Sequence, residues 1–174
     1  MGTLYQVVNE AQATQIAGPP AGVTTSTTLF TLLQLQSTAG QPIRVKEWGV
    51  SFNGSALAAG FGCDLMDSGT VAATVTAFAA VDITVYNPDT PAQSGTTTGV
   101  PFILSTTASG FTSSAEGTIT APRIFDNQFV EPIGGYWKQF PLGAEPLITP
   151  GHNLRVRVKG DGTTKCCAYV VVEV

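Results

Sequence analysis

Charged side chains are scarce in this 174-residue chain: Asp, Glu, Lys and Arg make up 11% of it, against about 25% in typical soluble domains. The net charge is −4, and Lys and Arg form no basic run. The chain therefore lacks the basic surface through which proteins bind nucleic acid. It also lacks a long apolar run, and its N-terminus has no basic segment before an apolar one, so we expect no membrane span and no signal peptide.

Residues suited to nucleophilic catalysis are also few. The only histidine, His152, lies in the turn segment Pro150-Gly151-His152, and no GxSxG motif is present. A serine or cysteine nucleophile needs a histidine placed beside it by the fold. We interpret His152 as an exposed turn residue.

The three cysteines, Cys63, Cys166 and Cys167, form no CxxC motif. Adjacent side chains on a strand point to opposite faces, so Cys166 and Cys167 do not readily pair with each other. We expect buried thiols rather than a disulfide framework or a zinc site.

Two pairs of carboxylates lie close in sequence, Asp64 with Asp67 and Asp126 with Glu131. Paired carboxylates serve glycosidases and calcium sites, but neither pair lies in a calcium-loop pattern. We interpret them as solvated acids of turns and strand edges. The sequence therefore predicts no catalytic residue, no cofactor and no metal, and a protein that is not an enzyme.

Hydrophobic residues make up 43% of the chain, which also contains 19 Gly and 11 Pro. Many short apolar segments separated by turn residues predict an all-β protein, a sandwich or barrel of about eight to ten antiparallel strands. The turn-rich segment 87–99 favours a jelly roll over an up-and-down meander. We expect a single sandwich over residues 23–174, preceded by an N-terminal strand or extended arm over residues 1–22. If residues 1–18 are an arm, their removal leaves the domain folded.

Period-two patterns predict where the strands lie. In the segment 43–52 the two apolar sets have opposite parity, and a bulge near Glu47 or Gly49 would bring both to one core. The segment 68–80 is ambiguous between helix and strand. The other predicted strands before the C-terminal block are 27–36, 61–66, 80–86, 100–106, 111–121 and 123–130.

The C-terminal block predicts a β-hairpin. Leu154, Val156 and Val158 alternate with basic residues, and the turn dipeptide Asp161-Gly162 precedes an apolar strand that starts at Cys166. A two-residue loop would pair Val156 with Cys167 and Leu154 with Tyr169. The return strand is apolar on both faces, so either it is central in the sandwich or its second face meets another subunit.

A subunit interface is one explanation of these faces; Arg stems packed on apolar residues, with their heads in water, is the other. The candidate interface residues are Tyr5, Val7, Arg155, Arg157, Tyr169, Val170 and Val172. Several aromatic residues could instead line a carbohydrate groove, although core and interface anchoring are commoner uses of such residues. They are Trp48, Phe125, Tyr136, Trp137 and Phe140.

The segments 136–143 (YWKQFPLG), 154–158 (LRVRV) and 168–173 (AYVVVE), with Glu145-Pro146 and Pro150-Gly151 between them, resemble tailed-bacteriophage head decoration (capsid cement) proteins. The resemblance implies a jelly-roll β-sandwich, a homotrimer, and a place on the outer surface of the virion. There such proteins tie neighbouring major capsid subunits together after synthesis in the host cytoplasm. The alternative function is a host-recognition or carbohydrate-binding module of a phage tail fibre or minor tail protein.

Overall fold

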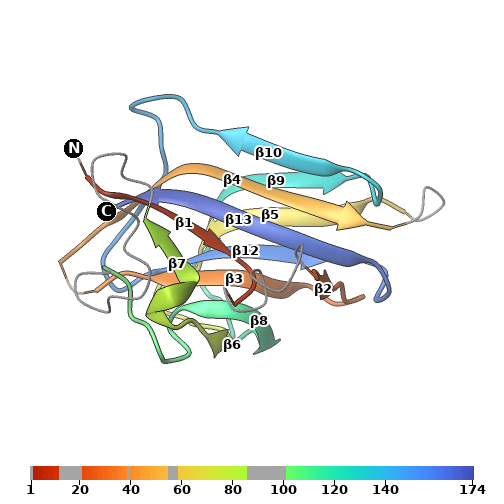
Figure 1. Cartoon of the computed structure of the whole chain (residues 1–174), viewed down its shortest axis with the longest axis horizontal. Coiled ribbons are helices and arrows are strands. Elements are labelled where there is room, and N and C mark those ends of the chain that lie inside the picture. The colour runs from red at the N-terminus through yellow and green to blue at the C-terminus, as the bar shows by residue number, and fades with distance from the viewer. Residues whose placement is uncertain (1, 12–20, 39, 55–58, 86–100) are drawn as a thin grey trace.

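The computed structural model describes residues 2–11, 21–38, 40–54, 59–85 and 101–174. Within these residues, thirteen strands form two antiparallel sheets packed face to face (Figure 1). Their bounds are β1 (Leu4–Val8), β2 (Val23–Thr24), β3 (Phe30–Gln36), β4 (Ile43–Asn53), β5 (Phe61–Asp67), β6 (Thr74–Ala77), β7 (Ile83–Val85), β8 (Gly110–Ala115), β9 (Arg123–Val130), β10 (Gly135–Gln139), β11 (Leu147–Ile148), β12 (Asn153–Lys159) and β13 (Lys165–Glu173).

The strand order confirms the predicted jelly-roll-like sandwich. Sheet A has the order β10-β4-β13-β1-β7, and sheet B has the order β6-β8-β3-β12-β5-β9. The chain crosses between the sheets from β3 to β4, from β4 to β5, from β9 to β10 and from β12 to β13, as in a jelly roll. The short strands β6, β7 and β8 extend the two sheets at one side.

The predicted C-terminal hairpin is wrong, because β12 and β13 lie in opposite sheets. β12 pairs with β3 and β5, whereas β13 pairs with β4 and β1. The Asp161-Gly162 turn does form, and Gly162 has a φ of 80°, but it carries the chain across the sandwich. The apolar rows of the two strands thus face each other through the core instead of sharing one face. Alternation shows which residues share a face, but it does not select the partner strand.

The carboxylate of Asp161 holds this crossing in place. It accepts hydrogen bonds from the backbone N–H groups of Thr163 and Thr164, both at 2.8 Å, and from the Thr164 hydroxyl at 2.9 Å. The Thr25 hydroxyl, beside β2, donates to the same carboxylate at 3.1 Å. The pKa of Asp161 is lowered, chiefly because backbone N–H groups stabilise its charged form.

The predicted bulge in β4 is confirmed. Val171 of β13 pairs with Glu47 and Val172 pairs with Val45, so Lys46 is the extra residue. The bulge reverses the parity of the strand, as the sequence pattern required. The apolar residues on both sides of it are therefore buried in one core: Ile43, Val45, Trp48, Val50 and Phe52.

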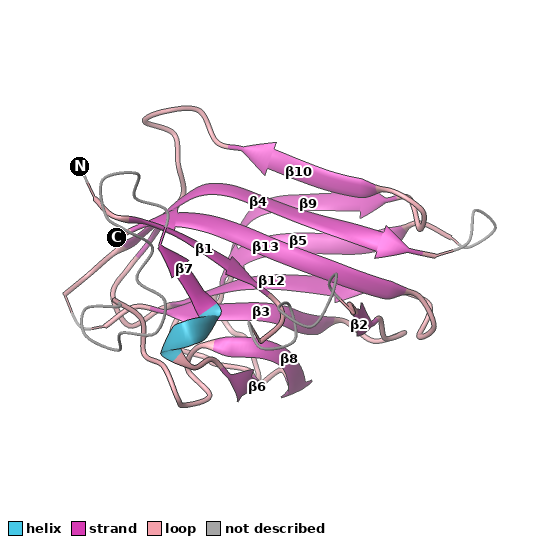
Figure 2. Cartoon of the chain, in the orientation of Figure 1, coloured by secondary structure: helices cyan, strands magenta, loops and turns pink. Residues whose placement is uncertain are grey.

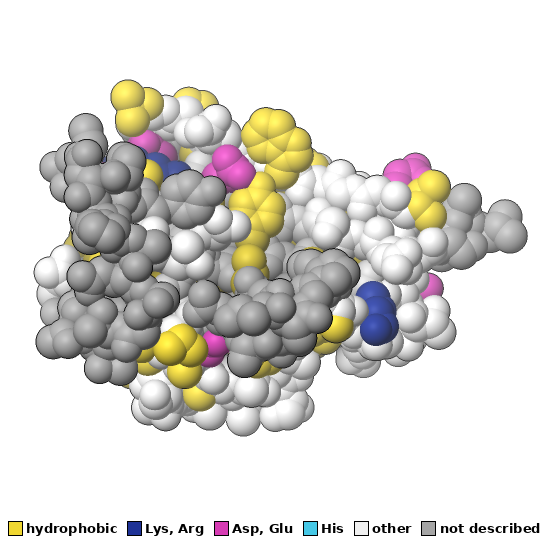
Figure 3. Space-filling view, in the orientation of Figure 1, with side chains coloured by type: hydrophobic (Ala, Val, Ile, Leu, Met, Phe, Trp, Pro, Cys, Tyr) yellow, Lys and Arg dark blue, Asp and Glu magenta, His cyan; other side chains and the backbone are white. Residues whose placement is uncertain are grey.

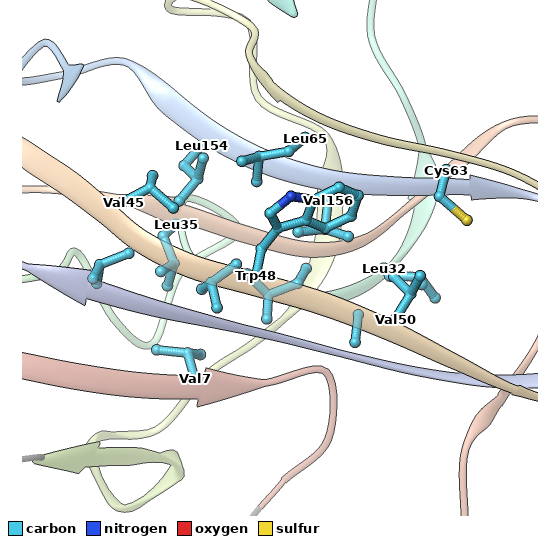
Figure 4. Packing of buried hydrophobic residues seen from close by; sticks show 14 of the residues in the cluster. Val7, Leu32, Leu35, Val45, Trp48, Val50, Cys63, Leu65, Leu154 and Val156 are labelled. Carbon is cyan, nitrogen blue, oxygen red and sulfur yellow. The ribbon is translucent and has the colours of Figure 1, made fainter. Parts of the chain in front are cut away.

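The core fills the space between the two sheets. Trp48 is fully buried within it, and Figure 4 shows its ring beside two residues of the opposite sheet, Leu65 of β5 and Val156 of β12. Aromatic pairs extend the core outward: Phe52 meets Phe61 edge-on, with 5.0 Å between ring centroids.

The N-terminal residues belong to the sandwich. β1 pairs with β13 on one side and β7 on the other, and the side chains of Tyr5 and Val7 are buried. The strand alternative is therefore correct for residues 4–8, and the arm alternative is wrong for them. Removing residues 1–18 would take out a strand from within sheet A. The rest of the proposed arm, over residues 12–20, lies outside the described residues.

Three further predictions need correction. The segment 80–86 begins as a 3-10 turn over Ala80–Asp82, the coiled element in Figure 2, before β7. The segment 100–106 forms an isolated bridge between Phe102 and Ser37 instead of a strand, and the strand expected over 111–121 ends at Ala115. The strand predicted over 123–130 is confirmed as β9. The loop predicted over 87–99 lies outside the described residues.

Val7→Ala tests the place of β1 in the core. Val7 is fully buried, so the change should lower the free energy of unfolding by about 2 kcal/mol. Val8→Ala is the matched control, because Val8 lies half-buried on the opposite face. This change should lower the free energy of unfolding by less than about 1 kcal/mol. Urea unfolding followed by circular dichroism measures both. Equal losses would contradict the assignment of faces.

Candidate binding groove on sheet A

The structure brings four of the predicted interface residues together, but in the core. Tyr5 pairs with Val172 and Val7 pairs with Val170 across β1 and β13. All four side chains are buried within one chain, so the prediction that they contact a partner is wrong. They are core residues because β13 is central in sheet A and its even-numbered side chains face sheet B.

The two predicted interface arginines lie on the outer face of sheet B. Arg157 binds Asp64 through two hydrogen bonds of 2.9 and 2.6 Å. Arg155 is fully buried, and its Nη1 donates to the carbonyl oxygen and the carboxylate of Glu116, at 3.0 and 3.2 Å. Burial lowers the pKa of Arg155. The cationic heads are thus paired inside the chain, neither solvated nor offered to a partner.

His152 is more than an exposed turn residue. Its Nδ1 lies 3.1 Å from a carboxylate oxygen of Asp67, a buried residue. Arg123 Nε lies 3.4 Å from the same carboxylate oxygen. The hydrogen bonds of the described residues join the His152 ring to Asp67 and to no serine or cysteine side chain. This arrangement is a structural cluster around the Asp67 carboxylate, which contacts the His152 ring and forms an ion pair with Arg123.

Tyr169, the remaining predicted interface residue, lies on the outer face of sheet A. It borders a groove of about 470 Å³ that runs over β1, β13, β4 and β10. In Figure 3 hydrophobic side chains gather near the middle of the face that sheet A presents. We call this hollow the sheet A groove; its lining includes Gln6, Val8, Asn9, Glu10, Ser51, Trp137, Cys167 and Tyr169.

The floor of the groove lies beside Gly49 of β4. Gly49 pairs with Trp137 of β10 on one side and with Tyr169 of β13 on the other. A Cβ at Gly49 would lie 2.5 Å from the Tyr169 ring, so any larger residue would displace that ring. Sequence reasoning missed Gly49, because nothing local distinguishes it from a turn glycine.

The Tyr169 ring is held in a fixed orientation. Its hydroxyl donates to Glu47 Oε1 at 2.5 Å. Burial, together with this hydrogen bond and the negative charge of Glu47, raises the pKa of Tyr169. The phenol therefore stays protonated, and the ring stays over Gly49 with its hydroxyl bound to Glu47.

Asp126 of β9 holds β10, the strand that carries Trp137, through hydrogen bonds on the core side of the sheet. The Asp126 carboxylate accepts hydrogen bonds from Tyr136 Oη at 2.8 Å and from Trp48 Nε1 at 3.2 Å. Gln128 donates to it at 2.8 Å, and Lys138 Nζ lies 3.5 Å away. Tyr136 and Lys138 point inward, so Trp137 between them points outward and is 67% exposed.

Burial alone would raise the pKa of Asp126. The hydrogen bonds from Gln128, Tyr136 and Trp48, with the charge of Lys138, outweigh burial and lower that pKa. Burial and the bond to Asp126 raise the pKa of Tyr136 to about 12. Asp126 is therefore a charged acceptor that joins the two sheets, not the solvated strand-edge acid that the sequence predicted.

Asn9, another residue of the lining, carries a buried amide. It is 2% exposed, and its Oδ1 accepts a hydrogen bond from the backbone N–H of Ala168 at 2.8 Å. Its Nδ2 is buried and has no hydrogen-bond partner among the described residues. No sequence motif marks this residue.

The aromatic residues that were candidates for a carbohydrate groove divide into two groups. Trp48 is in the core, and Phe125, Tyr136 and Phe140 pack against it. Trp137 is at the surface and lines the groove. Tyr169, predicted for an interface, supplies the second ring.

A second surface feature lies along the side of the sandwich formed by β9, β10, β11 and their connections. Of the eight large hydrophobic residues exposed in the described part of the chain, six fall here. We call this surface the β9–β11 side; its residues are Ile124, Phe129, Ile133, Trp137, Leu142 and Leu147. β9 and β10 are each paired on one edge only in the described residues.

Comparisons with protein-family models, curated proteins and solved structures find no match for this chain. Among the described residues, no three His, Cys, Asp or Glu side chains gather where they could hold a metal ion. In that part of the chain no helix is long and apolar enough to cross a membrane.

Asp126→Asn tests the anchoring of β10. The amide offers a donor where the carboxylate accepts several hydrogen bonds, so the variant should lose about 2 kcal/mol of unfolding free energy at neutral pH. The pKa of Asp126 is lower in the folded state, so its stabilising effect is complete above its ordinary value of 3.8 and disappears as the pH falls through the folded-state pKa.

Urea unfolding of both proteins from neutral pH to about pH 2 measures this effect. We expect the difference between wild type and variant to be constant near neutrality and to shrink in acid. A difference that stays the same at every pH would contradict the role of the carboxylate.

Proposed function

We propose that this chain is a virion structural protein that decorates the outer surface of a tailed-bacteriophage capsid. It acts without catalysis, by holding neighbouring major capsid subunits together. The resemblance of the C-terminal block to head decoration proteins supports this proposal. The jelly roll is compatible with it, since viral structural domains are among the proteins built on this fold, although fold alone does not define function.

The observation that carries the proposal is the concentration of exposed hydrophobic residues on the β9–β11 side. Phe129 is 86% exposed and Leu142 is 94% exposed. Large apolar side chains grouped on a soluble surface mark sites of contact with other proteins. The one-sided edges of β9 and β10 also offer backbone groups for pairing. We assign this side to the contact with the major capsid protein.

The charge distribution supports a docking surface of this kind. The best-buried cations, Arg155 and Arg157, are paired within the chain on the outer face of sheet B. Attachment would therefore rest on apolar contact and shape rather than on charge. A homotrimer would present three β9–β11 sides at once, and multivalent contact strengthens weak single contacts.

The double variant Phe129→Ser, Leu142→Ser tests the proposal. Both side chains are exposed, so the fold should survive, but binding to the capsid should weaken at least tenfold. Each lost factor of ten corresponds to about 1.4 kcal/mol of contact. The assay is co-sedimentation with DNA-free shells of a tailed-phage major capsid protein.

Val81→Ser is the matched control, because Val81 is an exposed hydrophobic residue, 44% accessible, that lies away from the β9–β11 side. It should bind shells like the wild type. Equal binding by the double variant and the wild type would reject the assigned surface, and failure of the wild type to bind would reject the function. Light scattering of the free protein, expected at three times 18.0 kDa, tests the trimer separately.

A further inference from the structure

We infer that the sheet A groove is a binding site for a neutral oligosaccharide, with Trp137 and Tyr169 as stacking platforms. This activity goes beyond capsid attachment and does not depend on it. The groove lies on the outer face of a sheet, whereas the proposed capsid contact centres on the β9–β11 side. Trp137 is common to both surfaces, so Tyr169 and Leu142, which each belong to only one of them, separate the two proposals.

The placement of the two rings suits consecutive sugar units. Trp137 and Tyr169 are the direct partners of Gly49 on its two sides, so their backbones are two strand spacings apart, roughly 10 Å. Directly opposed residues point to the same face of a sheet. The two rings thus lie on the same face of sheet A, with the Tyr169 ring over the bare backbone of Gly49. The apolar face of a pyranose can lie on each ring, because aromatic rings bind apolar surfaces while their polar edges remain hydrated.

The polar groups of the groove match hydroxyl groups. Its lining includes Gln6, Asn9 and Ser51. Side-chain amides and hydroxyls can both donate and accept hydrogen bonds, as the hydroxyl groups of a sugar do.

The charges of the lining disfavour an anionic ligand. Glu10 is the only Asp, Glu, Lys, Arg or His residue in the groove's lining within the described residues, and Glu47 holds the Tyr169 hydroxyl. An anionic sugar would meet carboxylates and no cation in this lining, whereas a neutral glycan avoids that repulsion.

The Tyr169 ring is already ordered and the strand that carries Trp137 is held in place, which lowers the entropy lost on binding. Glu47 holds the hydroxyl of Tyr169, and the Tyr169 ring rests on Gly49. The hydrogen bonds from Tyr136 and Trp48 to Asp126 hold the strand of Trp137. The groove therefore needs little rearrangement to accept a flat ligand.

The test uses the full chain on an array of neutral and sialylated bacterial, plant and animal oligosaccharides, followed by calorimetry with the neutral glycan bound best. Trp137→Ala and Tyr169→Ala should each weaken binding at least tenfold. Tyr169→Phe keeps the ring and should weaken it less than threefold. Ligand binding should also shift the tryptophan fluorescence of the wild type to shorter wavelength, because Trp137 is exposed and Trp48 is buried.

Leu142→Ala is the matched control, since Leu142 is more exposed than Trp137 but lies outside the groove. It should bind the glycan like the wild type, and circular dichroism verifies the fold of each variant. The inference is overturned if no neutral glycan on the array binds above the level of Trp137→Ala, if Tyr169→Ala binds normally, or if sialylated glycans bind as well as neutral ones. Capsid binding by Tyr169→Ala should be normal, so failure of either proposal is seen independently of the other.

Discussion

The apolar core that β12 and β13 share from opposite sheets is the constraint on which the rest of the structure depends. Val156 and Val158 of one strand and Val170 and Val172 of the other are buried in the same core. Each strand is central in its own sheet, so it positions a neighbour on both of its edges. The Asp161 turn lets two consecutive strands occupy these opposed places. Both strands pair with strands that lie far from them in sequence: β12 pairs with β3, and β13 pairs with β1. The fold therefore depends strongly on non-local contacts.

The two outer faces of the sandwich have different chemistry because their polar groups are satisfied differently. On sheet B the arginines of β12 are neutralised by Asp64 and Glu116, so that face is internally paired. On sheet A the bulge at Lys46 and the bare backbone at Gly49 leave room for an aromatic groove. The proposed glycan site and the proposed capsid contact therefore use side chains that are not packed into the core.

Asp126 links the core to both proposals. It lies in β9 but accepts hydrogen bonds from Tyr136 in β10 and Trp48 in β4. Through these contacts it closes the sandwich at the edge where β9 and β10 meet. The same contacts orient Trp137 outward, toward the groove. An acid near a strand edge thus connects core packing with the surface available for recognition.

The sequence by itself determined the local features. Short apolar segments located β9, turn residues located the turn at Asp161-Gly162 but not the crossing between sheets that it makes, and opposite parity in the segment 43–52 located the bulge. These patterns are readable because they depend on neighbours along the chain. Tertiary structure alone decided that β12 and β13 separate into two sheets, that Tyr5 and Val170 face the core, and that Trp137, Gly49 and Tyr169 meet. Those outcomes depend on which strands pair, and the free energy of pairing comes from packing between distant segments, which no local pattern records.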